Sequence, residues 1–247
     1  MVERQECDFT GQQLRRVVVR GADLRGGAIS DSRVRGVDLW NLDIHGGLTN
    51  VRVNGVDIAP LVEAELNRRD PDRAKMRPDS PDGFREAWTI LEGRWAATVG
   101  RARAFPEAQL HEPVGDEWSF IQTLRHLCFA TDAWVARMVL GDPSPWHSLD
   151  LPWDEAPGWD GIPWDREARP SLDEVLAVRA KRQAMVRGVL ADLTDEQLAS
   201  RVTRTEPGWP QAEDFPLEEC LLIVLNEEWE HRGYAERDLT ALEAQGS

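Results

Sequence analysis

The feature that most constrains the fold of this chain is a five-residue repeat near its N-terminus. Counted from Cys7, consecutive blocks of five carry an apolar residue at every third position, with frequent aspartate at the second position and glycine at the fifth. The third positions are Phe9, Leu14, Val19, Leu24, Ile29, Val34, Leu39 and Ile44. A period of five matches neither an α-helix nor a β-strand. An internal repeat of this kind therefore predicts a solenoid.

The repeat resembles the pentapeptide-repeat family, whose pattern is A-D/N-L-x-x. The resemblance covers residues 7–46, with a weaker continuation to about Ile58. Members of that family form a right-handed, square β-helix, so the resemblance implies about two to three turns here, with Phe9 under Ile29. We therefore expect residues 1–60 to form a short β-helix.

The remainder of the chain is predicted to be a linker and a helical region. Residues 69–82 are rich in proline and aspartate and lack apolar periodicity, and the run LVEAELN before them predicts a helical turn, so residues 61–82 are predicted to be a linker. From Gly83 onward, apolar residues recur at intervals of three and four, as in amphipathic helices. We expect four long helices. The first begins near Gly83, the second spans about Glu117–Leu140, and the third follows the N-cap Ser171. The last spans about Asp214–Ala244, with Pro216 in its first turn.

Four long helices predict a four-helix bundle over residues 83–247, with a short additional helix at 194–198. Residues 141–170 hold six prolines and four tryptophans, which predicts a long ordered loop or a lid. The predicted fold class is therefore α+β in two domains, a short right-handed pentapeptide β-helix followed by the bundle.

Composition narrows the class of partner. The formal net charge is −15, which argues against nucleic-acid binding because that binding depends on Lys and Arg at phosphates. No apolar run approaches the roughly 18–20 residues of a membrane helix, so we expect no membrane partner. Three scattered cysteines and an N-terminus unlike a secretory signal favour a cytoplasmic protein. Eleven tryptophans predict either an aromatic-walled cavity or a tryptophan-rich core.

The candidate chemistry lies in the last predicted helix and the second. Glu227 and His231 are four residues apart, so both side chains lie on one helical face and can bind the same ion. Glu228, three residues before His231, is a second candidate, and His126 has small and polar neighbours on its own helix. Spacing alone leaves open whether these residues bind a metal or form an ordinary surface pair. The other histidines are expected to be solvated or loop residues, and Cys128 and Cys220 to be core residues.

The same residues resemble the DinB superfamily. Trp118, Ser119 and His126 match its second helix, and the run EEWEHRGYAERDL matches its last helix, over about residues 80–245 in all. The mycothiol-dependent maleylpyruvate isomerase branch has Glu and then His four apart, as at Glu227 and His231. The resemblance implies a divalent metal, with zinc expected, held by His126, Glu227 and His231, with coordination positions left open. It also implies a low-molecular-weight thiol such as mycothiol as co-substrate. The isomerase has an extra C-terminal domain that this sequence lacks, so we do not expect that particular isomerisation.

The predicted function is a zinc-dependent, thiol S-transferase-like reaction of a small-molecule thiol with a small electrophile. Trp118, Trp134, Tyr234 and Arg232 are the predicted substrate-binding residues. Two alternatives stay open: a non-catalytic metal-containing binding protein that uses the β-helix for docking or homodimerisation, and a metal-dependent hydrolase. Whether the protein is an enzyme, and which residues are catalytic, is left open by the sequence.

Overall fold

The chain forms two units in the computed structural model, which describes residues 7–22, 24, 27–115, 117–154, 156–159, 162–205, 208–210 and 214–246. Residues 1–48 make one unit and residues 49–247 the other. Helices dominate the second unit, whereas the described residues of the first contain neither helix nor strand. Across the described ranges, no helix combines the length and the apolarity needed to cross a membrane.

The backbone of the first unit repeats its conformation every five residues. The fifth positions of the blocks have left-handed φ angles at Gly11 (70°), Arg16 (57°), Gly21 (62°), Asp31 (46°), Gly36 (63°), Asn41 (52°) and Gly46 (154°). Glycine, asparagine and aspartate adopt this region at the lowest steric cost, which accounts for their frequency at the fifth position. Arg16 is the exception, and Gly26, the remaining fifth position, lies outside the described residues. The sequence period is therefore present in the structure as a corner every five residues.

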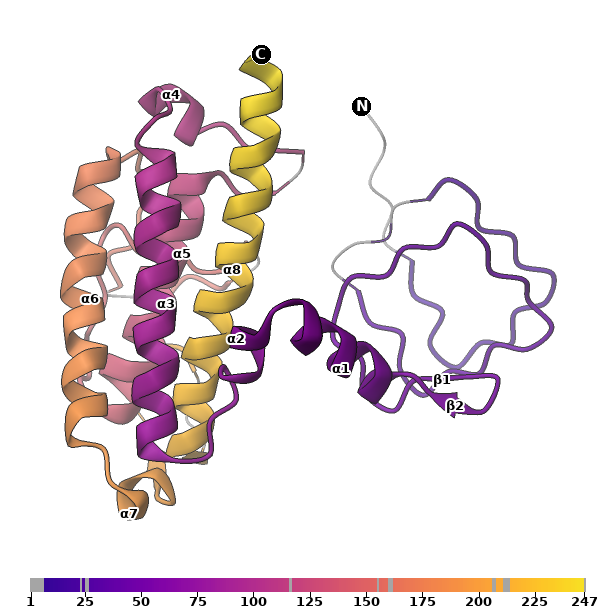
Figure 1. The fold of residues 1–247 in the computed structure, drawn as a ribbon, viewed down its shortest axis with the longest axis horizontal. Coiled ribbons are helices and arrows are strands. Elements are labelled where there is room, and N and C mark those ends of the chain that lie inside the picture. The colour runs from indigo at the N-terminus through magenta and orange to yellow at the C-terminus, as the bar shows by residue number, and fades with distance from the viewer. Residues whose placement is uncertain are drawn as a thin grey trace. The chain divides into compact units, whose positions relative to one another are not determined.

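The predicted β-helix is not shown. Between residues 7 and 48, the described positions contain no strand, and Figure 1 draws them as a winding trace. The third-position side chains are exposed, from 49% for Leu14 to 84% for Ile29, and Phe9 is 58% exposed. The recurring corner is observed, whereas a right-handed β-helix over residues 1–60 stays a prediction.

The second unit opens with a hairpin and two short helices. The hairpin pairs β1 (Arg52–Val53) with β2 (Val56–Asp57), and α1 (Ala59–Arg69) and α2 (Pro71–Ala74) follow it. Asn54 and Gly55, which connect the strands, have φ angles of 51° and 84°, the conformation that two-residue hairpin turns favour. The run LVEAELN lies in α1, so the residues predicted as a linker, 61–82, include α2 and most of α1.

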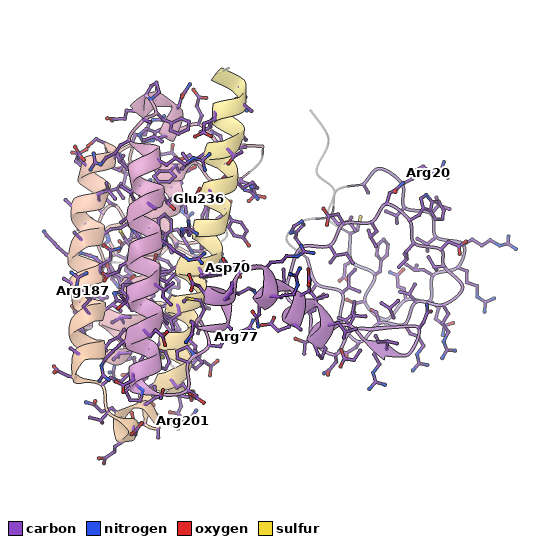
Figure 2. The ribbon with its side chains drawn as sticks, in the orientation of Figure 1. Arg20, Asp70, Arg77, Arg187, Arg201 and Glu236 are labelled. Carbon is purple, nitrogen blue, oxygen red and sulfur yellow. The ribbon has the colours of Figure 1, made fainter. Side chains whose placement is uncertain are left out.

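Two aspartates around α2 bind the bundle. Asp70 accepts from Arg94 Nη1 at 2.7 Å, and Asp72 accepts from Arg94 Nε at 3.0 Å; Asp70 lies at α2 in Figure 2. Asp70 also caps α2 by accepting from the Asp72 backbone N–H at 3.2 Å. Met76 is 6% exposed in the bundle core. The segment from Asp70 to Met76 therefore packs on the bundle, and the predicted domain limits stay a prediction.

Four long helices form the bundle (Figure 1). They are α3 (Pro81–Ala102), α5 (Phe120–Thr131) with its π-helical continuation η1 (Asp132–Val139), α6 (Leu172–Asp192) and α8 (Leu217–Gly246). α5 packs against α6 and α8, and α3 packs against the same two helices, so the four close a ring. Two short helices, α4 (Glu107–Leu110) and α7 (Asp195–Leu198), lie in the connections. The predicted helical C-terminal region is confirmed.

Two helix starts differ from the prediction. The second helix begins at Phe120 rather than near Glu117, because Ser119 is its N-cap and forms a capping box with Gln122. The last helix begins at Leu217: residues Asp214–Pro216 form β4, which pairs antiparallel with β3 (Arg201–Thr203). The backbone N–H of Leu217 donates to the Ser200 carbonyl at 2.9 Å instead of continuing a helix backward. The capping box predicted at Ser171 and Glu174 is confirmed.

A buried ion pair lies inside the bundle. The guanidinium of Arg179 on α6 donates to both carboxylate oxygens of Glu228 on α8, at 3.2 and 2.9 Å. The two side chains are only 4% and 2% exposed. At this depth each charge depends on its partner, because neither is solvated by water.

We predict that Arg179→Met lowers the free energy of unfolding by about 3–5 kcal/mol, because Glu228 would be left as a buried, unpaired charge. Urea titration of the full chain measures this loss. Arg187→Met is the matched control: Arg187, labelled in Figure 2, pairs with Glu92 while its side chain is 52% exposed, and its loss is expected within about 1 kcal/mol. Equal losses for the two variants would contradict the prediction.

Candidate metal centre

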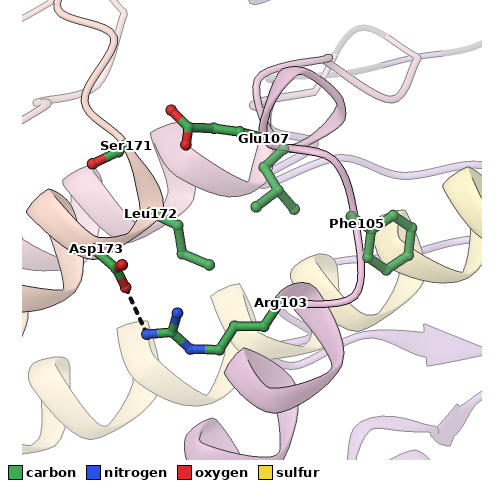
Figure 3. A pocket seen from close by; sticks show the side chains of 7 residues that line it. Arg103, Phe105, Glu107, Ser171, Leu172 and Asp173 are labelled. Carbon is green, nitrogen blue, oxygen red and sulfur yellow. Dashed lines mark hydrogen bonds and ion pairs between the residues drawn. The ribbon is translucent and has the colours of Figure 1, made fainter.

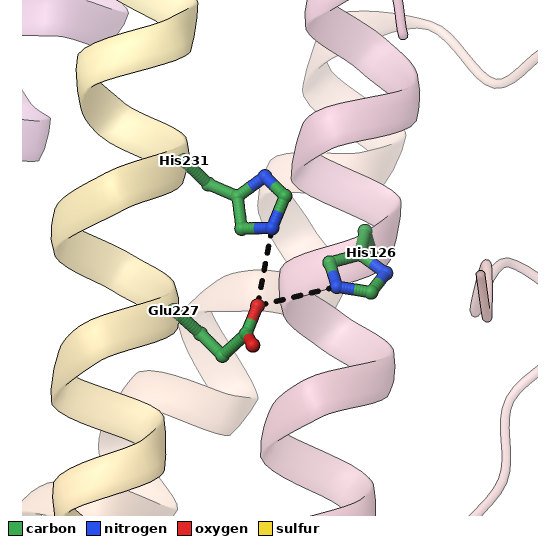
Figure 4. A group of neighbouring side chains, drawn as sticks. All are labelled: His126, Glu227 and His231. Carbon is green, nitrogen blue, oxygen red and sulfur yellow. Dashed lines mark hydrogen bonds and ion pairs between the residues drawn. The ribbon is translucent and has the colours of Figure 1, made fainter. Parts of the chain in front are cut away.

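Three side chains from two neighbouring helices meet at one point. His126 lies on α5, and Glu227 and His231 lie one turn apart on α8. Glu227 Oε2 is 3.3 Å from His126 Nε2 and 3.1 Å from His231 Nε2, and Figure 4 shows this carboxylate pointing between the two rings. One donor atom from each residue lies within 4.8 Å of the others. Two imidazoles and one carboxylate are a common donor set for a catalytic zinc site, so the residues present fit a divalent ion.

The ring of His126 is oriented by a backbone carbonyl. His126 Nδ1 lies 2.9 Å from the carbonyl oxygen of Leu151 in the long loop. A proton on Nδ1 donated to this oxygen leaves Nε2 as the ring atom directed at Glu227, and Nε2 is therefore the atom through which His126 would bind a cation.

The charge state of Glu227 suits a cation site. Burial raises the pKa of this carboxyl group, but hydrogen bonds from His126 and His231 outweigh burial and lower the pKa to about 2. The group is therefore ionised at neutral pH, and it adds the one formal negative charge of the three donors.

Glu228, the other candidate carboxylate, does not face the two histidines. Its carboxylate binds Arg179 inside the bundle, as described above. Successive residues of an α-helix point about 100° apart, so Glu227 and Glu228 face different neighbours. The structure therefore favours Glu227 as the ligand.

Two of the predicted substrate-binding residues lie beside the three donors. The ring of Trp118 lies 4.6 Å from that of His126 and stacks on that of His231 at 6.0 Å. Tyr234 meets His231 edge-on at 5.6 Å and is 44% exposed. Burial and the nearby Glu230 and Glu117 raise the pKa of the Tyr234 phenol, so this group stays protonated at neutral pH.

The other two lie in different surroundings. The ring of Trp134 packs edge-on against Phe215 at 5.2 Å. Arg232 donates to Glu236 at 3.4 Å, and Glu236 also binds Thr98 and Arg101 of α3. Arg232 thus belongs to the contact between α3 and α8, and the substrate roles of these four residues stay predictions.

Phe129, expected from its spacing of three residues to lie on the same helical face as His126, is 5.8 Å from the His126 ring. Two other neighbours of the centre were not found from the sequence. Asp154 in the loop accepts from Trp118 Nε1 at 3.2 Å, and the Leu151 carbonyl accepts from His126 Nδ1. A backbone carbonyl has no side-chain signature.

The remaining histidines and cysteines are not part of the centre. His45 is exposed, and the Nδ1 atom of His147 accepts from the Leu149 backbone N–H at 3.1 Å. Cys128 and Cys220 are buried, and burial raises the pKa of both thiols, that of Cys220 to about 12. They are core residues, as predicted, and not thiolate ligands.

A pocket of about 270 Å³ lies elsewhere, between the end of α3, α4 and the start of α6. Figure 3 shows its lining, including the ion pair of Arg103 with Asp173 at 2.7 Å. None of the three converging donors lines it. Its volume therefore says nothing about the space above the candidate metal centre.

Comparison with known proteins identifies the helical region. A model of the DinB superfamily matches residues 90–235, a range that contains His126, Glu227 and His231. No curated protein and no solved structure matches the chain significantly. The matched range covers more than half of the 247 residues, and the chain belongs to the DinB superfamily.

Proposed function

We propose that this chain binds one divalent ion, zinc, through His126, Glu227 and His231, and uses it in a transfer reaction between a low-molecular-weight thiol, such as mycothiol, and a small electrophile. The observation that carries the proposal is the convergence of these three donors within 4.8 Å. Proteins of the DinB superfamily commonly bind a divalent metal. Three protein donors leave coordination positions open, which is the pattern of catalytic rather than structural zinc.

When bound, such an ion acts as a Lewis acid that lowers the pKa of a thiol or a water molecule toward neutrality. The chain's own residues supply the surroundings of that chemistry. The ionised Glu227 would partly neutralise the cation, and the ring of Trp118 is tilted against that of His126 and stacked on that of His231. The protonated phenol of Tyr234 lies next to His231, where it can donate a hydrogen bond to a bound thiol or electrophile.

The first test is the metal content of the purified protein. We expect about one equivalent of zinc per chain in the wild type, measured by elemental analysis after dialysis, and loss of that zinc in Glu227→Gln and His231→Ala. Glu230→Gln is the matched control, because Glu230 is exposed one turn away on the same helix and undergoes the same change of charge. A wild-type protein without stoichiometric metal, or a control that loses it equally, would contradict the assignment.

The second test is turnover. Zinc-loaded protein should conjugate mycothiol or another cellular thiol to a generic electrophile, and His126→Ala should reduce kcat/KM by about 10²-fold or more, since the electrostatic contribution of the centre is lost. Thiol consumption and product mass measure the reaction. A loaded protein that hydrolyses an ester or amide instead supports the hydrolase, and one that is inert with every thiol supports a non-catalytic binding role.

The third test concerns the wall of the site. Trp118→Phe should raise KM for the thiol or the electrophile about fivefold, because a smaller ring offers less aromatic surface beside the two histidines. Trp134→Phe is the control, since the Trp134 ring packs on Phe215, and its KM should stay within about twofold of the wild type. The reverse ranking of the two variants would place the substrate on the Trp134 side.

A further inference from the structure

The long loop after η1 closes on itself near His126. The backbone N–H of Asp165 donates to the carbonyl of Ser148 at 3.1 Å. This contact brings together residues 148–149 and 165–168, which we call the neck of the loop. Between the two sides of the neck run the tryptophan-rich residues, with Trp164 packed edge-on against Phe129 at 5.5 Å.

The side chain of Arg125 lies at this neck and binds both of its sides. Its Nε atom donates to Leu149 O at 2.9 Å, and its Nη1 atom donates to Ala168 O at 2.8 Å. Further donations go to the carbonyls of Arg166, at 3.2 Å, and Asp165. Every one of these acceptors is a backbone carbonyl from the neck.

This arrangement is unusual for a cation at such depth. Arg125 is 1% exposed, and among the described residues its hydrogen bonds go to backbone carbonyls, while the carboxylates of Asp165 and Asp150 lie near enough to interact with its charge. Burying a guanidinium that donates to no carboxylate costs free energy, and here several converging carbonyl dipoles, together with the nearby charges of Asp165 and Asp150, offset that cost. Arg179 shows the usual alternative, a carboxylate partner at the same depth.

The neck leads directly to the contact that orients His126. Leu151 lies two residues after Leu149, and its backbone N–H donates to the carbonyl of Arg125 at 3.4 Å. Its own carbonyl lies 2.9 Å from His126 Nδ1. Adjacent residues of α5 therefore hold one short segment of the loop, Arg125 through its guanidinium and backbone and His126 through its ring.

We propose that Arg125 is a positioning residue of the metal centre. By fixing the neck, its guanidinium places the Leu151 carbonyl where it accepts a proton from His126 Nδ1, and this contact directs Nε2 at Glu227. The consequence for metal affinity rests on the proposed function, whereas the consequence for the His126 tautomer does not. A change in such an outer contact typically weakens metal binding 10–100-fold.

The experiment compares one substitution at two buried arginines of the full-length protein. Arg125→Lys keeps the charge but cannot reach all the neck carbonyls, and Arg179→Lys is the matched control on α6, where Arg179 is 3% exposed. Zinc affinity is measured by competition with a chromophoric chelator, and urea titration reports the stability of each variant. Nitrogen-15 NMR of the metal-free proteins reports the His126 tautomer. Arg125→Gln serves as a second, neutral variant.

We expect Arg125→Lys to weaken zinc binding about 10–100-fold and to mix the two tautomers of His126. Arg179→Lys should leave the zinc affinity within about threefold of the wild type and the His126 tautomer unchanged. A folded Arg125→Lys with unchanged affinity and tautomer would overturn the proposal. So would an equal effect at Arg179, or failure of both Arg125 variants to fold, because Arg125 would then only support the fold. If the wild type binds no zinc, the proposed function fails, but the tautomer still decides the role of Arg125.

Discussion

The packing of α5 against α8 is the contact on which the candidate centre depends, because neither helix carries a complete donor set. α8 supplies Glu227 and His231 through a spacing of one helical turn, and α5 supplies His126 across the interface. The neighbouring Glu228 points into the bundle and binds Arg179 of α6. A helix directs successive side chains to different neighbours. Glu228 therefore forms the buried ion pair inside the bundle, whereas Glu227 faces the two histidines.

The outer side of α5 carries a second set of polar contacts. Arg125 binds the neck of the long loop, and the ring of His126 makes a hydrogen bond with the Leu151 carbonyl of the same loop. The aromatic residues of the loop then pack on Phe129, one turn further along the helix. The loop has no regular secondary structure among its described residues, yet both hydrogen bonds and ring packing hold it to α5.

Much of the helical region could be predicted from the sequence, since apolar periodicity and caps act locally. Ser171 with Glu174 predicted the start of one helix correctly, whereas the pairing of β3 with β4 was missed because each strand has only three residues, too few to show an alternating pattern. The convergence of His126, Glu227 and His231 was predictable because spacing on α8 and a family resemblance agreed. The contact of the Leu151 carbonyl and the hydrogen bonds of Arg125 were not, because backbone acceptors have no residue signature and the loop's path is set by tertiary packing.

The left-handed corners of the first unit limit how that segment can change in length. Each corner falls on a fifth position, and most of those positions hold glycine, asparagine or aspartate. An insertion or deletion of five residues keeps every later corner on such a residue. Any other change shifts the corners onto neighbours such as Val37 or Leu42, whose side chains are poorly accommodated at positive φ. The segment can therefore grow or shrink by whole blocks, and its length should vary among related chains in steps of five.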